Sequence, residues 1–202
     1  MNALKLFLVV VALGLLAQPA QAQEALAIGA ALPAADRTMP NATGSPTSLA
    51  QHMGPRGLAV VFWCNTCPWV RRYESRVLAL ANEFGPAGVG FVAVNPNDPV
   101  AFPGDNMEAM RGQAAEGNYP FPYLADQGSQ VARAFGATRT PQIFLFNSEG
   151  TLVYEGTIDD SPSDAAQAQE RYFHEALSRM IANEPIRVEK TKAFGCTIKF
   201  QD

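Results

Sequence analysis

The feature that most constrains the fold of this chain is a buried-strand pattern that runs directly into a Cys-x-x-Cys motif and then into a helix. Residues 58–63 are apolar throughout, which predicts a buried strand. Apolar side chains then recur at three- and four-residue spacing over 69–84, which predicts a helix with one face in the core. Cys64 and Cys67 therefore lie where a strand passes into a helix N-terminus. Backbone N–H groups and the helix dipole stabilise an anion there, so a thiol at this point is expected to ionise readily.

Pro68 indicates which of the two cysteines is the more reactive. Proline is favoured at the first helical position, because its missing N–H has no intrahelical partner to lose there. A helix that begins at Pro68 makes Cys67 the N-cap, whereas capping by Cys64 would place the proline at the fourth position and lose a hydrogen bond. We therefore predict Cys67 as the activated thiolate and Cys64 as its disulfide partner.

The first 22 residues have the pattern of a secretory signal peptide. Lys5 precedes an unbroken apolar run over 6–17, and a small-residue cleavage pattern, A-x-A, ends at Ala22. A membrane anchor is the alternative, but the run is shorter than the roughly 20 residues that a spanning helix needs. We expect cleavage after Ala22, a periplasmic or secreted protein, and no stable insertion in the membrane.

Residues 23–202 are enough for one domain with a hydrophobic core, with a C-terminal tail from about residue 185. The chain has 15 Lys and Arg against 19 Asp and Glu, and its basic residues form no cluster, which argues against a nucleic-acid partner. Its three cysteines are an odd number, so at least one thiol is unpaired or pairs only transiently. In an oxidising compartment a cysteine pair can rest as a disulfide, and a reductive role then requires an electron donor.

Strand and helix patterns in the rest of the chain predict an α/β fold with a central mixed β-sheet. A second apolar strand at 88–95 follows the first helix, and a strand–helix–strand unit implies a sheet that is at least partly parallel. The last helix is expected at about 163–183, with an N-cap at Ser161 and Pro162 at the first position. Further helices are expected at 48–53, 105–116 and 129–135, and strands at 121–125, 142–146 and 151–155, of which the last two form an antiparallel hairpin.

Five sequence blocks carry a resemblance to a known family. They are F-x-C-N-x-C-P-x-V at 62–70, Y-P-F-P-Y-L-x-D at 119–126, T-P-x-x-F-L-F at 140–146, L-V-Y-x-G-x-I-D-D at 152–160 and G-C-x-I-K at 195–199. In this order they resemble thioredoxin-like redoxins, described as peroxiredoxin-like or thioredoxin-like proteins of the alkyl hydroperoxide reductase and thiol-specific antioxidant superfamily. The resemblance implies a thioredoxin-like fold for nearly the whole mature chain.

The resemblance also assigns roles outside the Cys-x-x-Cys motif. Thr140 and Pro141 match the cis-proline loop that faces the two cysteines and holds a partner's backbone as a strand would. Arg139 is expected beside this loop, either as a charge that stabilises a thiolate or as an ordinary solvated arginine. Trp69 is a candidate for lining a substrate groove, while Trp63 is expected in the core.

Two departures from the family pattern affect the expected chemistry. Thr66 stands where many members have histidine, and a neutral hydroxyl helps a thiolate less than an imidazolium, so we expect a less oxidising disulfide. The peroxiredoxin signature P-x-x-x-[TS]-x-x-C is absent as well. Counted back from Cys67, Cys64 occupies the Thr or Ser position and Val60 the Pro position.

Several sites have more than one interpretation. The cysteine pair has three interpretations. It is a redox dithiol, or half of a zinc site that is completed by two of Cys196, His52 and His174, or an inert disulfide. Cys196 is a third redox thiol that resolves a mixed disulfide or a sulfenic acid, or a small buried apolar residue. Both histidines are expected to be solvated.

The sequence favours an exported thiol-disulfide oxidoreductase in which Cys67 attacks, Cys64 resolves, and Thr140 with Pro141 holds the partner. No metal or organic cofactor is implied, since the dithiol carries the two electrons. The expected partners are protein thiols or disulfides and an electron-donor redox protein. A peroxiredoxin-like thiol peroxidase and a metal-binding or metallochaperone protein are the alternatives.

Overall fold

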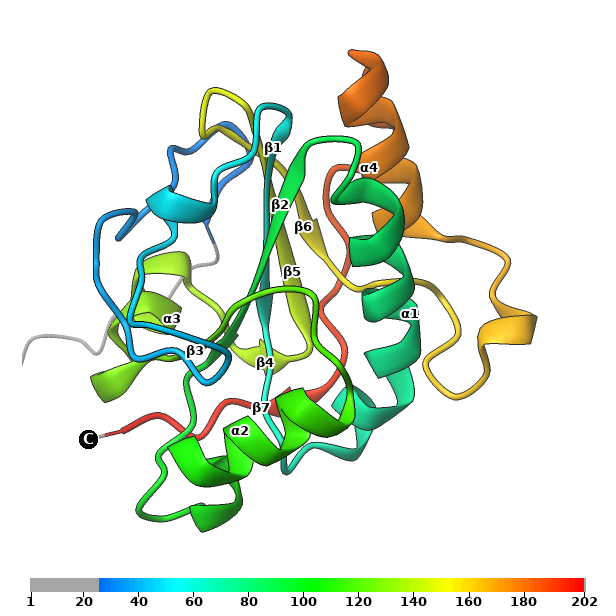
Figure 1. Cartoon of the computed structure of the whole chain (residues 1–202). Coiled ribbons are helices and arrows are strands. Elements are labelled where there is room, and N and C mark those ends of the chain that lie inside the picture. Colours follow the sequence, from blue (N-terminus) through cyan, green and yellow to red (C-terminus); the bar gives the residue numbers. More distant parts are fainter. Residues whose placement is uncertain (1–25, 202) are drawn as a thin grey trace, which may run out of the picture.

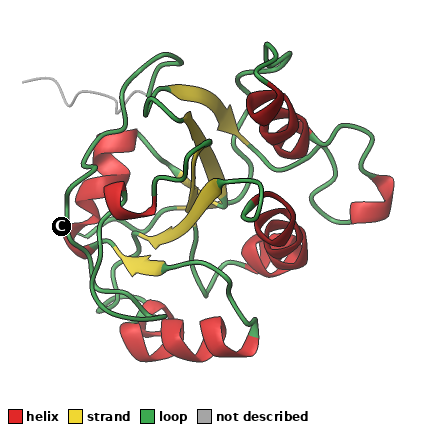
Figure 2. Ribbon diagram, turned by 45° about the horizontal axis from the view of Figure 1, so that its top comes forward, coloured by secondary structure: helices red, strands yellow, loops and turns green. Residues whose placement is uncertain are grey.

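A central β-sheet with helices on both faces forms the described part of the chain (Figures 1 and 2). The computed structural model describes residues 26–201, so the predicted signal peptide at 1–22 lies outside the described residues. The strands are β1 Gly57–Phe62, β2 Val89–Asn95, β3 Tyr123–Ala125, β4 Arg139–Thr140, β5 Gln142–Asn147, β6 Leu152–Gly156 and β7 Cys196–Thr197. The helices are α1 Pro68–Phe84, α2 Met107–Glu116, α3 Gln130–Phe135 and α4 Tyr172–Ala182, with short 3₁₀ turns at Ala50–His52, Pro103–Asp105, Gln127–Ser129 and Ala165–Gln167.

Both parallel and antiparallel strand pairs occur in the sheet, so the predicted mixed sheet is confirmed. β5 pairs antiparallel with β1 on one side and with β6 on the other, which confirms the predicted hairpin. β2 and β3 pair in parallel. β2 runs beside β1 (Figure 1), and just past the end of β1 the N–H of Trp63 donates to the carbonyl of Val94 at 2.8 Å. The cysteine motif thus follows a strand with neighbours on both sides.

The side chains of β1 and of Trp63, the residue after it, alternate between two hydrophobic cores, one on each face of the sheet. Those on one face pack with α1 and α4, and those on the other pack with α3 and the segment before β1. The first set is Ala59, Val61 and Trp63, the second is Leu58, Val60 and Phe62, and each is at most 1% exposed. Burying each of the larger side chains contributes about 1.5–3 kcal/mol, so the backbone that leads to Cys64 is firmly held.

The last helix begins later than the sequence predicted. α4 spans Tyr172–Ala182 rather than 163–183, and Ser161 is not its N-cap. Two aspartates bond the preceding backbone locally: Asp164 accepts from a backbone N–H of the 3₁₀ turn at 2.9 Å, and Asp160 accepts from one just before α4 at 3.0 Å. Such short-range hydrogen bonds compete with helix formation, and here they hold a loop where apolar spacing suggested a helix.

The predicted start of α2 is wrong by two residues, so the carboxylate of Asp105 is not part of the helix. Asn106 is the N-cap of α2 and accepts from the N–H of Ala109 at 2.9 Å. Asp105, predicted as the first helical residue, lies at the end of a 3₁₀ turn instead. The short helix expected at 48–53 is likewise only the 3₁₀ turn Ala50–His52.

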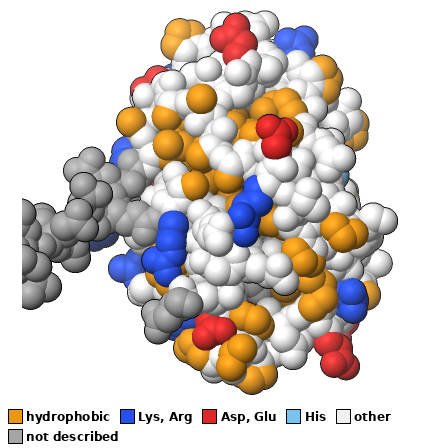
Figure 3. Space-filling view, turned by 90° about the vertical axis from the view of Figure 1, so that its left-hand side faces the viewer, with side chains coloured by type: hydrophobic (Ala, Val, Ile, Leu, Met, Phe, Trp, Pro, Cys, Tyr) orange, Lys and Arg blue, Asp and Glu red, His pale blue; other side chains and the backbone are white. Residues whose placement is uncertain are grey.

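The segment before β1 and helix α3 contribute to the face in Figure 3, where hydrophobic side chains gather in patches between isolated charged groups. Large hydrophobic side chains that are clearly exposed within residues 26–201 are Val100, Val188 and Phe194. Within the same residues, no helix is both long enough and apolar enough to cross a bilayer.

Candidate active site

The turn that carries the two motif cysteines is built as the sequence predicted. α1 begins at Pro68, and Cys67 is its N-cap in an extended backbone conformation. Cys64 lies two residues after the end of β1. Each cysteine is only 1% exposed. A reaction partner therefore reaches either sulfur only when the residues that cover it move.

Asp105, a buried carboxylate from another loop, holds this turn in place. Its Oδ1 accepts from the N–H of Asn65 at 2.6 Å, and its Oδ2 accepts from the hydroxyl of Thr66 at 2.7 Å. The side-chain amides of Asn95 and Asn97 donate to the same carboxylate at 3.1 and 2.9 Å. All four partners can donate, which suits an ionised carboxylate that only accepts. The spacing of the two cysteines thus depends on a residue about 40 positions away.

The C-terminal tail brings a third sulfur against the pair. β7 pairs antiparallel with β4, with Cys196 opposite Thr140 (Figure 1). The Sγ atom of Cys196 lies 2.7 Å from the Sγ atom of Cys67. Cys196 is half-buried, whereas Cys64 and Cys67 are buried. The structure therefore brings the predicted third cysteine to Cys67 and leaves it as the most exposed sulfur of the three.

Thr140 contacts both cysteines of the motif. Its Oγ1 lies 3.1 Å from the Sγ of Cys64, and its carbonyl oxygen lies 3.1 Å from the Sγ of Cys67. The peptide bond from Thr140 to Pro141 is cis, as the resemblance implied. The carbonyl can accept a hydrogen bond from a protonated Cys67 thiol, so this contact favours the neutral form of that sulfur.

Other neighbours outweigh that contact and lower the pKa of Cys67 to about 5. The largest cause is the hydrogen bond from the Cys64 thiol; burial opposes it, and the thiol of Cys196 lowers the pKa further. The backbone N–H groups of Val70 and Cys196 make smaller contributions. The helix N-terminus was expected to be the main cause of this acidity, but the Cys64 thiol lowers the pKa of Cys67 more than the helix N–H of Val70 does. Cys67 is therefore an anion at neutral pH.

The other two thiols keep their protons. The pKa of Cys64 is raised far above its ordinary value, first because its hydrogen bond to Cys67 needs the proton and then because of burial. Burial and the same kind of contact with Cys67 raise the pKa of Cys196 to about 11. The site thus holds one thiolate between two thiols, an arrangement suited to disulfide exchange.

Arg139 bonds the tail on both sides of Cys196. Its guanidinium donates to the hydroxyl of Thr197 at 2.8 Å and to the carbonyl of Gly195 at 3.5 Å. Its charge is one of the smaller influences on Cys196, whose pKa it lowers. It is not among the largest influences on the pKa of Cys67. Arg139 thus lies beside the Thr140 loop as predicted, and its charge lowers the pKa of Cys196.

The two tryptophans that flank the motif differ as expected. Trp63 is in the core, and its indole N–H donates to the hydroxyl of Tyr119 at 3.0 Å. Trp69 is half-buried and packs edge-on against Phe194 of the tail, with ring centroids 4.7 Å apart. Arg72 lies 5.1 Å from the centroid of the Trp69 ring. The Trp69 ring is thus partly covered by the tail.

Neither His52 nor His174 forms part of the cysteine site. His52 is half-buried rather than fully solvated, lies 3.0 Å from the hydroxyl of Thr47, and has its pKa lowered by burial. His174 lies 3.2 Å from a carboxylate oxygen of Glu83 on α1. Across residues 26–201, no group of three or more His, Cys, Asp or Glu side chains is arranged to hold a metal ion.

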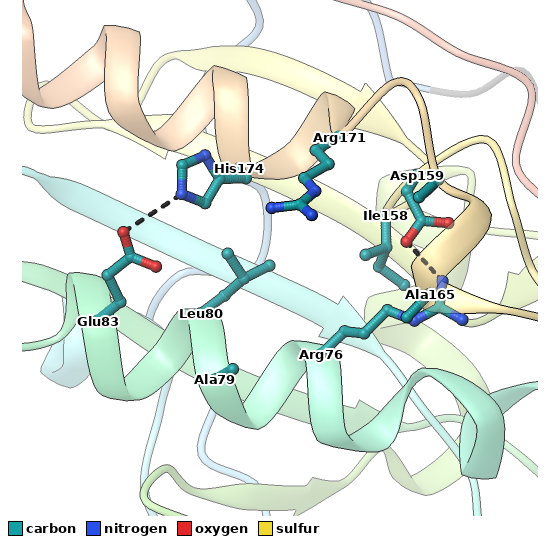
Figure 4. A pocket seen from close by; sticks show the side chains of 10 residues that line it. Arg76, Ala79, Leu80, Glu83, Ile158, Asp159, Ala165, Arg171 and His174 are labelled. Carbon is teal, nitrogen blue, oxygen red and sulfur yellow. Dashed lines mark hydrogen bonds and ion pairs between the residues drawn. The ribbon is translucent and has the colours of Figure 1, made fainter.

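A cavity of about 240 Å³ lies between α1 and α4, apart from the cysteines (Figure 4). Two polar pairs cross it, the ion pair of Arg76 with Asp159 and the hydrogen-bonded pair of His174 with Glu83. Leu80 lies between these pairs in the same view. None of the three cysteines lines this cavity. Because it contains no sulfur, we do not assign the redox site to it.

Sequence reasoning missed Asp105 and Tyr123. The hydroxyl of Tyr123, a buried residue, donates to Oδ1 of Asn65 at 2.8 Å and so supports the same turn. One signal was present: Asp105 and Asn106 are adjacent at the predicted start of this helix, both are favoured as N-caps, and only one of them can be the N-cap. The other was free to bond a distant segment.

Comparison with known proteins identifies the family. Residues 28–155 match the AhpC/TSA family. A curated relative, the thiol-disulfide oxidoreductase ResA of Halalkalibacterium halodurans, is 30% identical over 98 residues, which are 48% of this chain and 52% of that protein. The chain thus aligns with about half the length of this relative.

Solved structures extend the similarity to most of the chain. An uncharacterized conserved protein from Geobacillus kaustophilus is 32% identical, with a TM-score of 0.81, over 87% of this chain and 93% of that one. A hypothetical protein from Sinorhizobium meliloti is 31% identical, with a TM-score of 0.80, over 88% and 97%. A putative thiol:disulfide interchange protein DsbE from Chlorobium tepidum, 20% identical over 79% and 98% with a TM-score of 0.59, shares the fold. With the family match spanning more than half of its residues, the chain belongs to the AhpC/TSA family and has a thioredoxin-like α/β fold.

Proposed function

We propose that the protein is an exported thiol-disulfide oxidoreductase in which Cys67 is the reactive thiolate and Cys64 is the second sulfur of the redox pair. The observation that carries this proposal is the lowered pKa of Cys67, about 5, with protonated thiols on both sides. The curated relative is named for the same chemistry, which supports the proposal.

The reaction needs only the sulfurs and a partner disulfide. The Cys67 thiolate attacks one partner sulfur, the partner's S–S bond breaks, and a mixed disulfide forms while the other partner sulfur leaves as a thiolate and takes up a proton. Cys64 then loses its proton and attacks Cys67. The Cys64–Cys67 disulfide forms and the partner's second thiol is released. Two electrons pass from the pair to the partner.

Access to Cys67 depends on the tail. β7 pairs with β4, and an extended segment of a partner can pair with β4 in the same way. We therefore expect a partner to displace β7 and then to lie against Thr140, Pro141 and Trp69. The burial of both motif cysteines would protect them between encounters.

The pattern of residues 1–22 supports export to the periplasm or beyond the cell. In an oxidising compartment the Cys64–Cys67 pair would not return to the dithiol by itself, so the cycle requires an electron-donor redox protein.

Single-turnover reduction of insulin disulfides by the reduced mature protein tests the proposal. Cys67→Ser should abolish the reaction, because no thiolate remains to attack. Cys64→Ser should accumulate a mixed disulfide at Cys67 with the insulin chain. Trapping only by Cys67→Ser would reverse the roles of the two sulfurs, and an inactive wild-type protein would refute the proposal.

A thiol peroxidase is the second candidate, favoured by the thiol that lies 2.7 Å from the Cys67 sulfur. A hydroperoxide would oxidise the thiolate to a sulfenic acid and be reduced to an alcohol, and Cys196 or Cys64 would condense with the sulfenic acid to form a disulfide and water. Peroxide consumption that is lost in Cys67→Ser would support this activity. The metallochaperone alternative lacks a suitable cluster of ligands among residues 26–201.

A further inference from the structure

Cys196 has a position in the site that the proposed disulfide exchange between Cys67, Cys64 and a partner does not use. It lies beyond residues 28–155, the part of the chain that matches the AhpC/TSA family. Its sulfur is 2.7 Å from that of Cys67. A disulfide bond is about 2.05 Å long, so a bond between these two sulfurs requires them to approach by less than about 1 Å.

The chain after Cys196 is anchored to the body of the protein. Ile198 is 3% exposed and packs in the core that contains α3. The N–H of Lys199 donates to Oδ1 of Asn97 at 2.9 Å, and the carbonyl of Lys199 accepts from Asp98 at 2.8 Å. These contacts fix the tail immediately beyond the third sulfur.

The chain before Cys196 is fixed as well. Phe194 packs on Trp69, and Gly195 follows with a φ of +152°. A Cβ atom at Gly195 would lie 2.2 Å from the carbonyl oxygen of Thr140, so only glycine permits this approach. Anchors on both sides position the Cys196 sulfur against Cys67, where a loosely tethered tail would not.

The three cysteines differ in their exposure to solvent. Cys64 and Cys67 are 1% exposed, whereas Cys196 is half-buried at the surface of the tail. A donor protein presents its thiol on its own surface and attacks the sulfur that it can reach. With β7 in place, that sulfur is Cys196.

We propose that Cys196 is the sulfur through which an electron-donor dithiol re-reduces the protein, by way of a Cys67–Cys196 disulfide. The inference rests on the proposed function, because it supplies the second half of that cycle. It also gives the tail a place in the order of events: a partner displaces β7 in the first half-reaction, and β7 returns for the second.

The sulfur chemistry balances without a further oxidant. In the oxidised protein Cys196 loses its proton and attacks Cys67; the Cys64–Cys67 bond breaks, the Cys67–Cys196 bond forms, and Cys64 leaves as a thiolate that takes up the proton. A donor thiolate then attacks Cys196, and Cys67 leaves as a thiolate. The donor's second thiol attacks the mixed disulfide and releases Cys196, which is protonated. The donor becomes a disulfide, and its two electrons reside in the protein's thiols.

The acidity of Cys67 directs the donor to Cys196. In an unsymmetrical disulfide, the sulfur with the lower thiol pKa leaves faster. Attack at Cys196 expels Cys67, whose pKa the Cys64 thiol lowers, whereas attack at Cys67 expels Cys196, whose pKa is raised by burial. Leaving-group ability and exposure therefore favour the same sulfur.

Disulfide mapping in Cys64→Ser tests whether the proposed bond forms. The reduced variant is oxidised with stoichiometric diamide, digested without reduction and analysed by mass spectrometry. We expect an intramolecular Cys67–Cys196 disulfide and loss of both thiols. Two free thiols, or only disulfides between molecules, would overturn the inference.

Kinetics in proteins that retain Cys64 and Cys67 test the route. Reduction of insulin by the reduced protein and re-reduction of the oxidised protein by thioredoxin are measured separately. In Cys196→Ser, the ratio of the re-reduction rate to the insulin rate should fall roughly tenfold or more. Thr197→Ser, which keeps the hydroxyl bonded by Arg139, should keep the wild-type ratio.

The outcomes distinguish the two proposals. A wild-type protein that does not reduce insulin contradicts the proposed function itself. If the wild-type protein reduces insulin and Cys196→Ser has the same ratio of re-reduction rate to insulin rate as wild type, only the role of Cys196 is contradicted.

Discussion

Asp105→Asn should destabilise the reduced protein, because the carboxylate receives hydrogen bonds from donors on both of its oxygens. At the Oδ2 position the new NH₂ group faces the side-chain amide of Asn97, which donates at 2.9 Å. Asn97 cannot turn its amide without losing the bond that its oxygen accepts from Lys199 at 2.9 Å. At the Oδ1 position the NH₂ group faces the N–H of Asn65 and the amide of Asn95. Either orientation leaves a buried donor without a partner.

The magnitude follows from these contacts. A buried unsatisfied donor costs about 1–3 kcal/mol, and hydrogen bonds to charged groups contribute about 1.5–3 kcal/mol each. Losing the charge and one acceptor together gives an expected destabilisation of about 3–5 kcal/mol. For a chain of this size 1 kcal/mol lowers Tm by about 2–4 °C, so Tm should fall by roughly 6–20 °C.

Urea unfolding of the reduced mature protein, followed by tryptophan fluorescence, measures the change. Glu108→Gln is the control, since Glu108 is an exposed acid in the first turn of α2 and its loss should change the free energy of unfolding by no more than about 0.5 kcal/mol. An Asp105→Asn protein as stable as this control would refute the conclusion that the carboxylate holds the cysteine turn.

Three further predictions concern the sulfurs and the tail. Because the pKa of Cys67 is lowered to about 5 in the folded protein, the folded state binds fewer protons than the unfolded state from about pH 5 to pH 8.5. The free energy of unfolding of the reduced protein should therefore rise across this range by up to roughly 1.4 kcal/mol per pH unit, and this part of the stability is lost as the pH falls through 5. Urea unfolding at several pH values should show a shallower rise for Cys67→Ser, and equal slopes would contradict the assignment. Arg139→Ala should slow alkylation of Cys196 at pH 8, because a charge that lowers its pKa is lost, while thiolate absorbance still titrates near pH 5; an unchanged alkylation rate counts against this role. Gly195→Ala should dislodge β7, since its Cβ would lie 2.2 Å from a carbonyl oxygen of β4, and should speed alkylation of Cys196; a rate equal to wild type would mean that the close approach does not hold the tail.

Local sequence patterns were sufficient to predict the centre of the fold. The apolar run before Cys64, the proline after Cys67 and the helical spacing beyond it are all short-range signals, and the structure has a strand, an N-cap and a helix at these positions. The hairpin after Pro141 was predictable for the same reason, from two apolar runs joined by a turn.

Long-range contacts account for what the sequence left open or did not predict. The sequence left two interpretations for Cys196, which is 129 residues from Cys67, and only the fold brings the two sulfurs together. Asp105 likewise bonds the cysteine turn from a loop that has no pattern of its own. The late start of α4 has a different cause. Asp160 and Asp164 accept hydrogen bonds from nearby backbone N–H groups, which competes with helix formation, and the spacing of apolar residues carries no information about these bonds.

Titration of thiolate absorbance in the reduced protein tests the central claim most directly, with Cys67→Ser measured alongside. A thiolate held between the thiols of Cys64 and Cys196 predicts that wild type gains absorbance with a midpoint near pH 5 and that Cys67→Ser lacks this transition. A wild-type midpoint near 9, or the same low transition in Cys67→Ser, would contradict the account.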